Sequence, residues 1–182
     1  KSEQGADQAD ANLVGEIGLP DLLSHDGTEI AAHLRLLEQL QLYAGVRPVR
    51  AYPNTPLPLA DPRASAIDLV IVRESTEGLF YSAAVHDRTQ VSNENEVRDT
   101  LLITRNTTEK LHDFAFQLAR QRKNRDRPGR VTCVDKANVF RSMAFFRKIF
   151  DERADQFPDI LADHNYVDAQ ALDLIRKPWS FD

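Results

Sequence analysis

The chain has 182 residues, of which 42% are hydrophobic and 28% charged, the composition of an ordinary soluble globular protein. Its net charge of −5 argues against nucleic acid or an anionic membrane as the main partner. No apolar run approaches the roughly 18 residues of a membrane span, and no signal-peptide pattern opens the chain, so no membrane partner is expected. The only cysteine, Cys133, cannot form an intrachain disulfide, which fits a reducing, cytoplasmic compartment.

The N-terminal part is expected to hold one short strand and one helix. Residues 12–18 form the strand candidate, which runs into a Gly-Leu-Pro turn. From Thr28 a helix is predicted, because apolar residues recur at helical spacing. This apolar stripe consists of Ile30, Leu34, Leu37, Leu40 and Ala44. Gly45 is expected to cap the helix at its C-terminal end.

The next segments are predicted to be extended. A proline biases its predecessor away from helix, so residues 47–52 are expected to be extended, and further prolines within 53–62 mark an irregular connection. Residues 67–72 are a nearly continuous apolar run, which is typical of a strand covered on both faces in an α/β sheet. Residues 79–103 are polar and alternate weakly, which indicates a protruding hairpin or arm near 82–103.

Helix and strand patterns alternate in the second half of the chain. Asn106-Thr-Thr-Glu109 looks like a capping box, and it is expected to open a helix with Leu111, Phe114, Ala115 and Leu118 on one face. The basic run 120–127 has no interleaved aromatic residues and is interpreted as a solvated loop. The further elements expected are strand 130–134, helix 139–153, strand 160–167 and helix 169–176. This order predicts an α/β fold in which a sheet is flanked by helices.

Helix 139–153 is apolar over well over half of its circumference, whereas a surface helix needs a stripe of only about 100°. It contains Phe140, Phe145, Phe146 and Phe150. The helix is therefore expected to pack against two partners, which are either two layers of its own domain or its own domain and another subunit.

Three ionisable residues come after three separate predicted strands: Arg73, Lys136 and Asp168. In open α/β sheets, functional groups gather beyond the carboxyl ends of the strands. A guanidinium, an ammonium and a carboxylate suit an anionic substrate with a proton acceptor and a metal ligand nearby. The alternative, on spacing alone, is that these residues are ordinary strand-end charges that face water.

Three short sequence motifs surround these residues, in this order: Val72-Arg-Glu-Ser-Thr-Glu-Gly78, Val134-Asp-Lys-Ala-Asn-Val139 and His164-Asn-Tyr-Val-Asp168. Together they resemble the isocitrate/isopropylmalate dehydrogenase family, which includes tartrate dehydrogenases. Further motifs extend the resemblance over nearly the whole chain: Leu42-Tyr-Ala-Gly-Val-Arg-Pro48, Ala115-Phe-Gln-Leu-Ala119 and Leu174-Ile-Arg-Lys-Pro178. Any one of these motifs is weak evidence for the family, but the whole set in this order is strong evidence.

The resemblance implies a role for four residues. Arg47 and Arg73 match arginines that grip the substrate's carboxylates, for which a planar guanidinium is suited because it donates two hydrogen bonds to one carboxylate. Lys136 matches the lysine that helps to remove the hydroxyl proton, a role that requires a tunable charge state. Asp168 matches an aspartate that binds Mg²⁺ or Mn²⁺. The implied reaction is the oxidation of a malate-like 2-hydroxy dicarboxylate by NAD or NADP, usually followed by loss of CO2.

The resemblance also implies an assembly and a domain plan. In the family the lysine and the aspartate reach into the partner subunit's active site, so a homodimer with a shared active site is expected. Residues 1–64 are expected to belong to a first, cofactor-side domain and its crossover. Residues 65–182 are expected to form a second domain, truncated at its C-terminal end, with the substrate site and the dimer interface. The family's glycine-rich opening strand, second metal motif and adenosine-binding segment are not found, so both ends are expected to be cut and these 182 residues alone to be inactive.

Two positions depart from the family pattern. Leu37 stands at the family's first substrate arginine, and Arg35 lies about 200° round the predicted helix from it. Phe80 stands at the family's catalytic tyrosine, and the adjacent Tyr81 would point to the opposite face of a strand. These departures favour an alternative, in which the chain is a non-catalytic or impaired paralogue that acts as a dimeric binding or scaffold module. A generic α/β domain with accidental matches is the third possibility.

Overall fold

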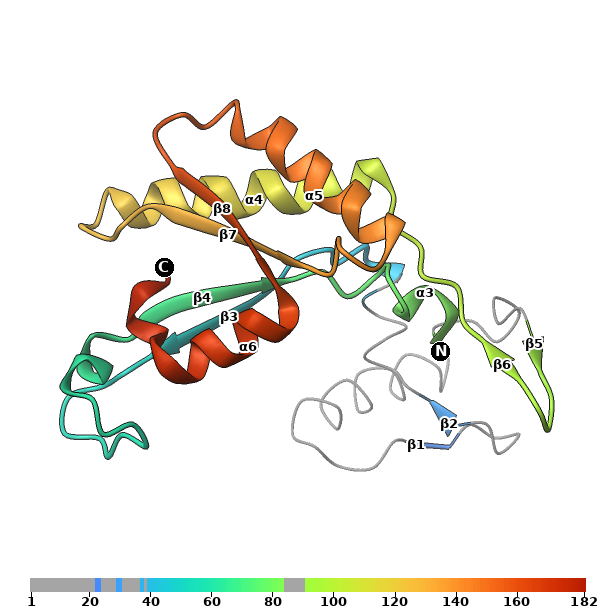
Figure 1. Ribbon diagram of the computed structural model, residues 1–182, viewed down its shortest axis with the longest axis horizontal. Coiled ribbons are helices and arrows are strands. Elements are labelled where there is room, and N and C mark those ends of the chain that lie inside the picture. Colours follow the sequence, from blue (N-terminus) through green and yellow to red (C-terminus); the bar gives the residue numbers. More distant parts are fainter. Residues whose placement is uncertain (1–21, 24–28, 31–36, 38, 84–90) are drawn as a thin grey trace, which may run out of the picture. The chain divides into compact units, whose positions relative to one another are not determined.

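The computed structural model describes residues 22–23, 29–30, 37, 39–83 and 91–182 of the chain (Figure 1). The chain forms two compact units. Residues 1–43 with 75–102 make up the first unit, and residues 44–74 with 103–182 make up the second. The strand predicted at residues 12–18 lies outside the described residues. The predicted site residues all belong to the second unit: Arg47, Arg73, Lys136 and Asp168.

In the first unit, strand β1 (Leu22–Leu23) pairs with strand β2 (Glu29–Ile30) in antiparallel register. The helix predicted from Thr28 is therefore wrong at its start, because Ile30 lies opposite Leu22 in a strand pair. Isoleucine is branched at Cβ, which favours a strand over a helix when local pairing is offered.

The helix predicted in this region also ends earlier than expected. Gln41 has a φ of 51°, in the left-handed region, and the amide of Leu42 donates a hydrogen bond to the carbonyl oxygen of Leu37 at 2.9 Å. A left-handed residue spanned by this six-residue hydrogen bond is a Schellman motif. Gly45 is therefore not the cap of the helix, and it begins the next strand instead.

Residues 79–103 contain a short helix as well as a hairpin. Helix α3 (Phe80–Ala83) stands where extended structure was predicted. Strands β5 (Val91–Ser92) and β6 (Val97–Arg98) pair antiparallel, which confirms the predicted hairpin. Its turn is closed by Asn93, whose side-chain oxygen accepts hydrogen bonds from the amides of Asn95 at 2.9 Å and Glu96 at 3.0 Å.

The second unit, all of which is described, contains two sheets and three α-helices (Figure 1). Strands β3 (Gly45–Arg50) and β4 (Asp68–Arg73) pair antiparallel, and strands β7 (Arg130–Asp135) and β8 (Leu161–Tyr166) pair parallel. The helices are α4 (Arg105–Lys123), α5 (Arg141–Ala154) and α6 (Val167–Arg176), with short 3-10 helices at Pro62–Ala66 and Pro178–Ser180. Helices α4 and α5 pack against each other and against β7. This arrangement confirms the predicted α/β fold.

The pairing of β3 with β4 crosses the predicted domain boundary at residues 64–65. Residues 44–64 are thereby grouped with the second unit. The assignment of residues 1–64 to a cofactor-side domain stays a prediction. Within the described ranges, no helix combines the length and the apolar character that crossing a membrane requires.

Helix α4 begins one residue before the predicted capping box, at Arg105. Its N-cap is Thr104, whose hydroxyl accepts a hydrogen bond from the amide of Thr107 at 3.4 Å. The carbonyl oxygen of Thr104 accepts a second bond, from the hydroxyl of Thr108 at 2.6 Å. Asn106 is therefore inside the first turn and not the cap, because Thr104 precedes the first helical residue and accepts a hydrogen bond from one of the free amides of the helix start.

The basic run 120–127 is not a solvated loop throughout, because α4 continues to Lys123. The Arg122 side chain is only 17% exposed, and it donates hydrogen bonds to Oδ1 of Asp182 at 2.6 Å and to the carbonyl oxygen of Asp68 at 2.7 Å. Asp182 also accepts a hydrogen bond from the amide of Gly129 at 2.8 Å. Since Asp68 begins β4 and Gly129 precedes β7, these bonds hold the amino ends of β4 and β7 near each other.

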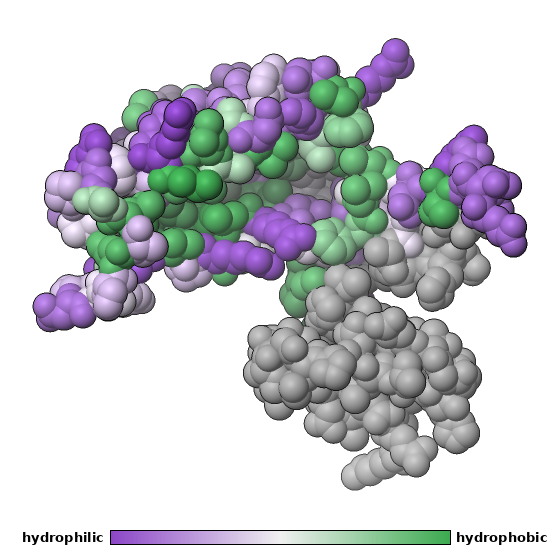
Figure 2. Space-filling view, turned by 60° about the horizontal axis from the view of Figure 1, so that its bottom comes forward, coloured by the Kyte–Doolittle hydropathy of each residue, from purple (hydrophilic) through white to green (hydrophobic). Residues whose placement is uncertain are grey.

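A cavity of about 330 Å³ lies along the same two strands. It is lined by residues 69–72 of β4 and 130–134 of β7, and by apolar side chains from α4 and α6. Figure 2 shows hydrophobic surface gathered in a band on this unit. The amino ends of β4 and β7 are joined through Arg122 and Asp182, and the cavity follows both strands, so β4 and β7 run in the same direction (Figure 1). Their carboxyl ends, at Arg73 and Asp135, therefore lie on the same side.

The core of the second unit is an aromatic stack. Phe116 of α4 and Phe150 of α5 stack with their ring centroids 5.1 Å apart, and Phe157 stacks on Phe116 at 5.0 Å. Phe116 is 0% exposed and Phe150 is 1% exposed. The predicted apolar face names Phe114 in place of Phe116, but Phe114 is only half-buried.

Helix α5 meets two partners within its own unit. It packs against α4 on one side and against β7 and β8 on the other, which buries Ile149 and Phe150. It begins at Arg141, so Val139 and Phe140 precede the helix and are 60% and 48% exposed. The intramolecular alternative therefore accounts for most of the helix, and the dimer interface stays a prediction.

His112 of α4 makes stability depend on pH. Its ring packs edge-on against Phe146, with centroids 4.5 Å apart, and Nε2–H donates to the carbonyl oxygen of Phe146 at 3.3 Å. Burial disfavours the charged ring and lowers the pKa of His112 to about 4. An unfolded chain takes up this proton near pH 6.5, so stability is expected to fall as the pH drops from about 6.5 to 4, by on the order of 3 kcal/mol.

Urea unfolding of the wild type and of His112→Leu, at pH 7 and at pH 4.5, measures this effect. The variant is expected to lose less stability than the wild type between the two pH values, because leucine has no proton to bind. Equal losses in the two proteins would contradict the assignment of this pH dependence to His112.

Candidate active site

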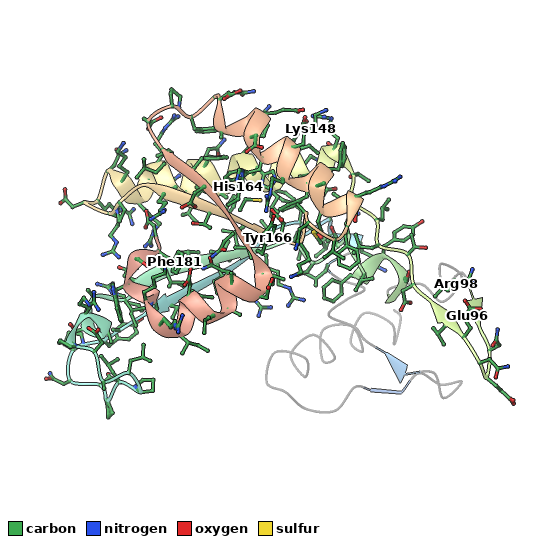
Figure 3. The ribbon with its side chains drawn as sticks, viewed as in Figure 1. Glu96, Arg98, Lys148, His164, Tyr166 and Phe181 are labelled. Carbon is green, nitrogen blue, oxygen red and sulfur yellow. The ribbon has the colours of Figure 1, made fainter. Side chains whose placement is uncertain are left out.

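Lys136 and Asp168 are brought together by the parallel pairing of β7 with β8. In this register Asp135 lies opposite Tyr166, and these two residues end the strands. Lys136 follows Asp135 directly, and Asp168 stands two residues after Tyr166, in the first turn of α6. The Nζ atom of Lys136 donates a hydrogen bond to Oδ1 of Asp168 at 2.5 Å. Figure 3 shows Tyr166 near the junction of β8 and α6.

The surroundings of Asp168 favour its ionised form. The hydrogen bond from Lys136 lowers the pKa of Asp168 below its ordinary value, and backbone hydrogen bonds at the start of α6 lower it further. The positive end of the helix dipole acts in the same direction. The Asp168 side chain is 68% exposed and that of Lys136 is 27% exposed. An ion pair with this much solvent exposure adds little to the stability of the fold, so we interpret it as part of a candidate reactive site.

Arg47 and Arg73 lie on the same face of the β3–β4 sheet. Arg47 lies opposite Ile71, and residues two apart along a strand share a face, so Arg73 is a diagonal neighbour of Arg47. Gly45, directly opposite Arg73, has no side chain to occupy the space between the strands. Both arginines are exposed, so this face can present two guanidinium groups to one dianion.

The two pairs are carried by different sheets. Arg73 ends β4 and Lys136 directly follows β7, and these two strands run in the same direction. The carboxyl ends of the strands therefore carry cationic groups from both sheets, at the edge where ligands of α/β folds bind. The cavity along the strands is a different feature, because its lining is mostly apolar and includes neither the two arginines of the β3–β4 face nor the Lys136–Asp168 pair.

A single carboxylate does not make a divalent-cation site. Mg²⁺ takes about six oxygen ligands in near-octahedral geometry. In the part of the chain that the structure describes, no three His, Cys, Asp or Glu side chains gather so that they could hold a metal ion. Asp168 fits as one ligand, because its carboxylate is ionised and exposed, but the described residues do not complete the set.

Sequence reasoning missed the ion pair behind Lys136. The buried carboxylate of Asp135 accepts two hydrogen bonds from Arg147 of α5, each 2.8 Å long. The guanidinium carbon of Arg147 also lies 5.0 Å from the ring centroid of Tyr166. An acidic residue at the end of an apolar strand was the available signal, because a buried charge requires a partner. The sequence alone did not say which of several arginines supplies it.

The two departures from the family pattern lie in the first unit. Leu37 is half-buried, and its carbonyl oxygen takes part in the helix-ending hydrogen bond. Phe80 and Tyr81 open α3. The prediction that they point to opposite faces of a strand is wrong, because consecutive residues of a helix are about 100° apart.

The second unit is thus an α/β unit with an arginine at the end of strand β4, a lysine directly after β7, and an aspartate in the first turn of α6, which follows β8. A family model described as isocitrate/isopropylmalate dehydrogenase matches residues 1–182. The chain therefore belongs to the isocitrate/isopropylmalate dehydrogenase family.

The similar proteins include several 3-isopropylmalate dehydrogenases. That of Heyndrickxia coagulans is 37% identical over 180 residues, which cover 96% of this chain and 47% of the relative. That of Thermotoga maritima is 36% identical over 181 residues, covering 96% and 48%. A solved isocitrate dehydrogenase from Methylococcus capsulatus superposes with a TM-score of 0.71 at 30% identity, covering 90% of this chain and 46% of that one. The chain spans about half the length of these relatives.

Proposed function

We propose that the protein in its natural length oxidises a malate-like 2-hydroxy dicarboxylate, with NAD or NADP as hydride acceptor and Mg²⁺ or Mn²⁺ as cofactor, in the cytoplasm. The observation that carries this proposal is the contact between Lys136 and Asp168 at the carboxyl ends of two parallel strands. It occurs in a chain that matches the dehydrogenase family over its whole length.

In this proposal each side chain has one task. Arg47 and Arg73 hold the carboxylates of the substrate through paired hydrogen bonds. Lys136, as a neutral amine, would accept the hydroxyl proton of the substrate. A bound nicotinamide would supply the acceptor for the hydride on C2, so that the product is a 2-keto acid. The amine has to be neutral when the substrate reacts, because an ammonium cannot accept a proton. Asp168 is one ligand of the cation, which supplies Lewis-acid chemistry to the substrate's oxygens when bound.

We further propose a homodimer in which Lys136 and Asp168 serve the active site of the partner subunit. Val139 and Phe140, next to Lys136 in the chain, are 60% and 48% exposed, and exposed apolar residues of this size are typical of an interface. A protein that sediments as a monomer at assay concentrations would contradict the shared active site.

A dimeric binding or scaffold module is the second candidate. Two substitutions favour it: Leu37 cannot bind a carboxylate, and Phe80 has no hydroxyl from which to donate a proton. Losing one charge-assisted hydrogen bond to the substrate costs roughly 1.5–3 kcal/mol. That loss weakens substrate binding, and it equally fits a substrate that is shorter or differently charged.

The experiment that separates the candidates uses the protein in its natural length. Reduction of NAD and of NADP is measured with malate, tartrate and 3-alkylmalates, with and without Mn²⁺, and release of CO2 is measured alongside. Turnover that depends on Mn²⁺ supports the dehydrogenase, and CO2 release decides whether decarboxylation follows. A folded dimer that turns over none of these substrates supports the scaffold.

Arg73→Lys is expected to raise KM for the dicarboxylate about 10- to 100-fold. Lysine keeps the positive charge but cannot donate the paired hydrogen bonds of a guanidinium to one carboxylate. Arg50→Lys is the matched control, because Arg50 lies on the opposite face of the β3–β4 sheet and its side chain is 62% exposed. Steady-state kinetics of both variants measure the effect, and equal changes in KM would contradict a role of Arg73 in substrate binding.

A further inference from the structure

The turn that presents Lys136 is held by an ion pair that has no task in the proposed reaction. The side chain of Asp135 is 0% exposed, and Arg147 donates to it from Nε to Oδ2 and from Nη2 to Oδ1, both at 2.8 Å. Oδ1 of Asp135 also accepts a hydrogen bond from the amide of Ala137 at 2.8 Å. Arg147 thus connects helix α5 to Asp135, whose carboxylate in turn holds the amide of Ala137 on the other side of Lys136.

The backbone of Lys136 is fixed on its other side by local hydrogen bonds. Its carbonyl oxygen accepts hydrogen bonds from the amides of Val139 at 2.9 Å and Phe140 at 3.0 Å. These bonds lie within the turn itself, whereas Arg147 reaches the turn from the middle of α5. The guanidinium therefore ties the turn to helix α5.

Arg147 also contacts the strand that leads to Asp168. Its guanidinium carbon lies 5.0 Å from the ring centroid of Tyr166, and Nζ of Lys136 lies 5.9 Å from the same centroid. Tyr166 pairs with Asp135 in the β7–β8 register. One side chain of α5 therefore contacts the strand ends on which both Lys136 and Asp168 depend.

We propose that Arg147 is a positioning residue, which acts through Asp135 and Tyr166 to hold the amine of Lys136 at the carboxyl ends of β7 and β8. A guanidinium is required because its planar fork bonds both carboxylate oxygens in fixed directions, whereas the ammonium of lysine is a compact point charge without that fork. The effect on rate rests on the proposed function, but the effect on the turn can be measured without any turnover.

Amide hydrogen exchange of this chain tests the turn. In Arg147→Lys, the amides of Ala137, Val139 and Phe140 are expected to exchange at least about tenfold faster than in the wild type, while amides in the middle of α4 keep their rates. Exchange that accelerates equally in the turn and in α4 would show a general loss of stability and would overturn the proposal. Unchanged exchange in the turn would overturn it as well.

Arg153→Lys is the matched control. Arg153 is also on α5 and donates two hydrogen bonds to Asp113, of 2.6 and 2.8 Å, with a side chain 22% exposed against 24% for Arg147. This pair joins α5 to α4 and does not touch the turn. Arg153→Lys is therefore expected to leave the exchange of the three turn amides within about twofold of the wild type.

The rate of the natural-length protein provides the second readout. Arg147→Lys is expected to lower kcat roughly 10- to 100-fold with KM changed less than about threefold, because misplacing a reacting group by about 1 Å has an effect of this size. In a Lys136→Met background the same substitution is expected to cause no further loss, because no amine is left to position. Losses that multiply would indicate a merely structural role and overturn the proposal.

The two readouts separate this inference from the proposed function. Faster exchange of the turn in a natural-length protein without turnover supports the positioning by Arg147 and contradicts the dehydrogenase. If Arg147→Lys does not fold, Asp135→Asn combined with Arg147→Gln removes both charges together and leaves no buried charge without a partner. The double variant is expected to show the same faster exchange in the turn, and wild-type exchange there would overturn the proposal.

Discussion

Replacing Lys136 by methionine is expected to lower kcat for oxidation of the 2-hydroxy dicarboxylate by roughly 10²- to 10⁴-fold, the range of general acid–base catalysis. Methionine keeps a chain of similar length, so the side chain still fills its place beside Tyr166. Folding should be unaffected, because the lost ion pair with Asp168 is solvent-exposed on the aspartate side and contributes little to stability. Steady-state kinetics of the natural-length protein at saturating substrate measure the effect.

Lys148→Met is the control for this prediction. Lys148 lies on α5, its side chain is 68% exposed, and its ion pair with Glu152 lies within the same helix. Its replacement removes the same charge from the same unit and is expected to change kcat less than about twofold. If Lys136→Met keeps a kcat near that of Lys148→Met, then Lys136 does not take the hydroxyl proton, and the proposed mechanism is wrong.

The second large effect is expected on stability. Phe116→Ala should lower the free energy of unfolding by about 3–5 kcal/mol, because it removes a fully buried ring and leaves a cavity that its neighbours do not fill. Two aromatic contacts are lost with it, since Phe150 and Phe157 both stack on Phe116. Urea unfolding followed by the fluorescence of Trp179, the chain's single tryptophan, measures the change.

Tyr52→Ala removes an aromatic ring of similar size from the surface of the same unit, where Tyr52 is 63% exposed. It is expected to change the free energy of unfolding by no more than about 0.5 kcal/mol. A loss in Phe116→Ala as small as that in Tyr52→Ala would mean that the stack between α4 and α5 is not the core of this unit.

The sequence predicts an element well where a single local pattern decides it. Strands β7 and β8 match their predicted ranges closely, because each is a short run between a turn and a helix signal. The same reasoning fails where two local signals compete. Ile30 fits a helical stripe and a strand equally well, and the pairing with Leu22 decides between them. Thr104 and Asn106 are both residue types that favour the N-cap position, and the helix starts at Arg105, which makes Thr104 the N-cap.

The candidate site shows the same division. The prediction that Lys136 and Asp168 take part in catalysis rests on the ordered family motifs that surround both residues, and the kinetic experiments test their proposed roles. Their contact is tertiary: it joins residues 32 apart through the register of two parallel strands. The sequence contains that register only indirectly, because a shift by one residue would turn every side chain of a strand to the other face.

The sequence by itself determined the α/β class, the family and the residue types available at the strand ends, because these follow from local patterns and from sequence motifs in a fixed order. Only the tertiary structure decided that Arg147 reaches Asp135 and that Phe116, not Phe114, enters the core. The physical reason is the same in both cases. A two-point hydrogen bond and a stacked ring depend on distances of a few ångströms between separate elements, and spacing along a chain does not specify those distances.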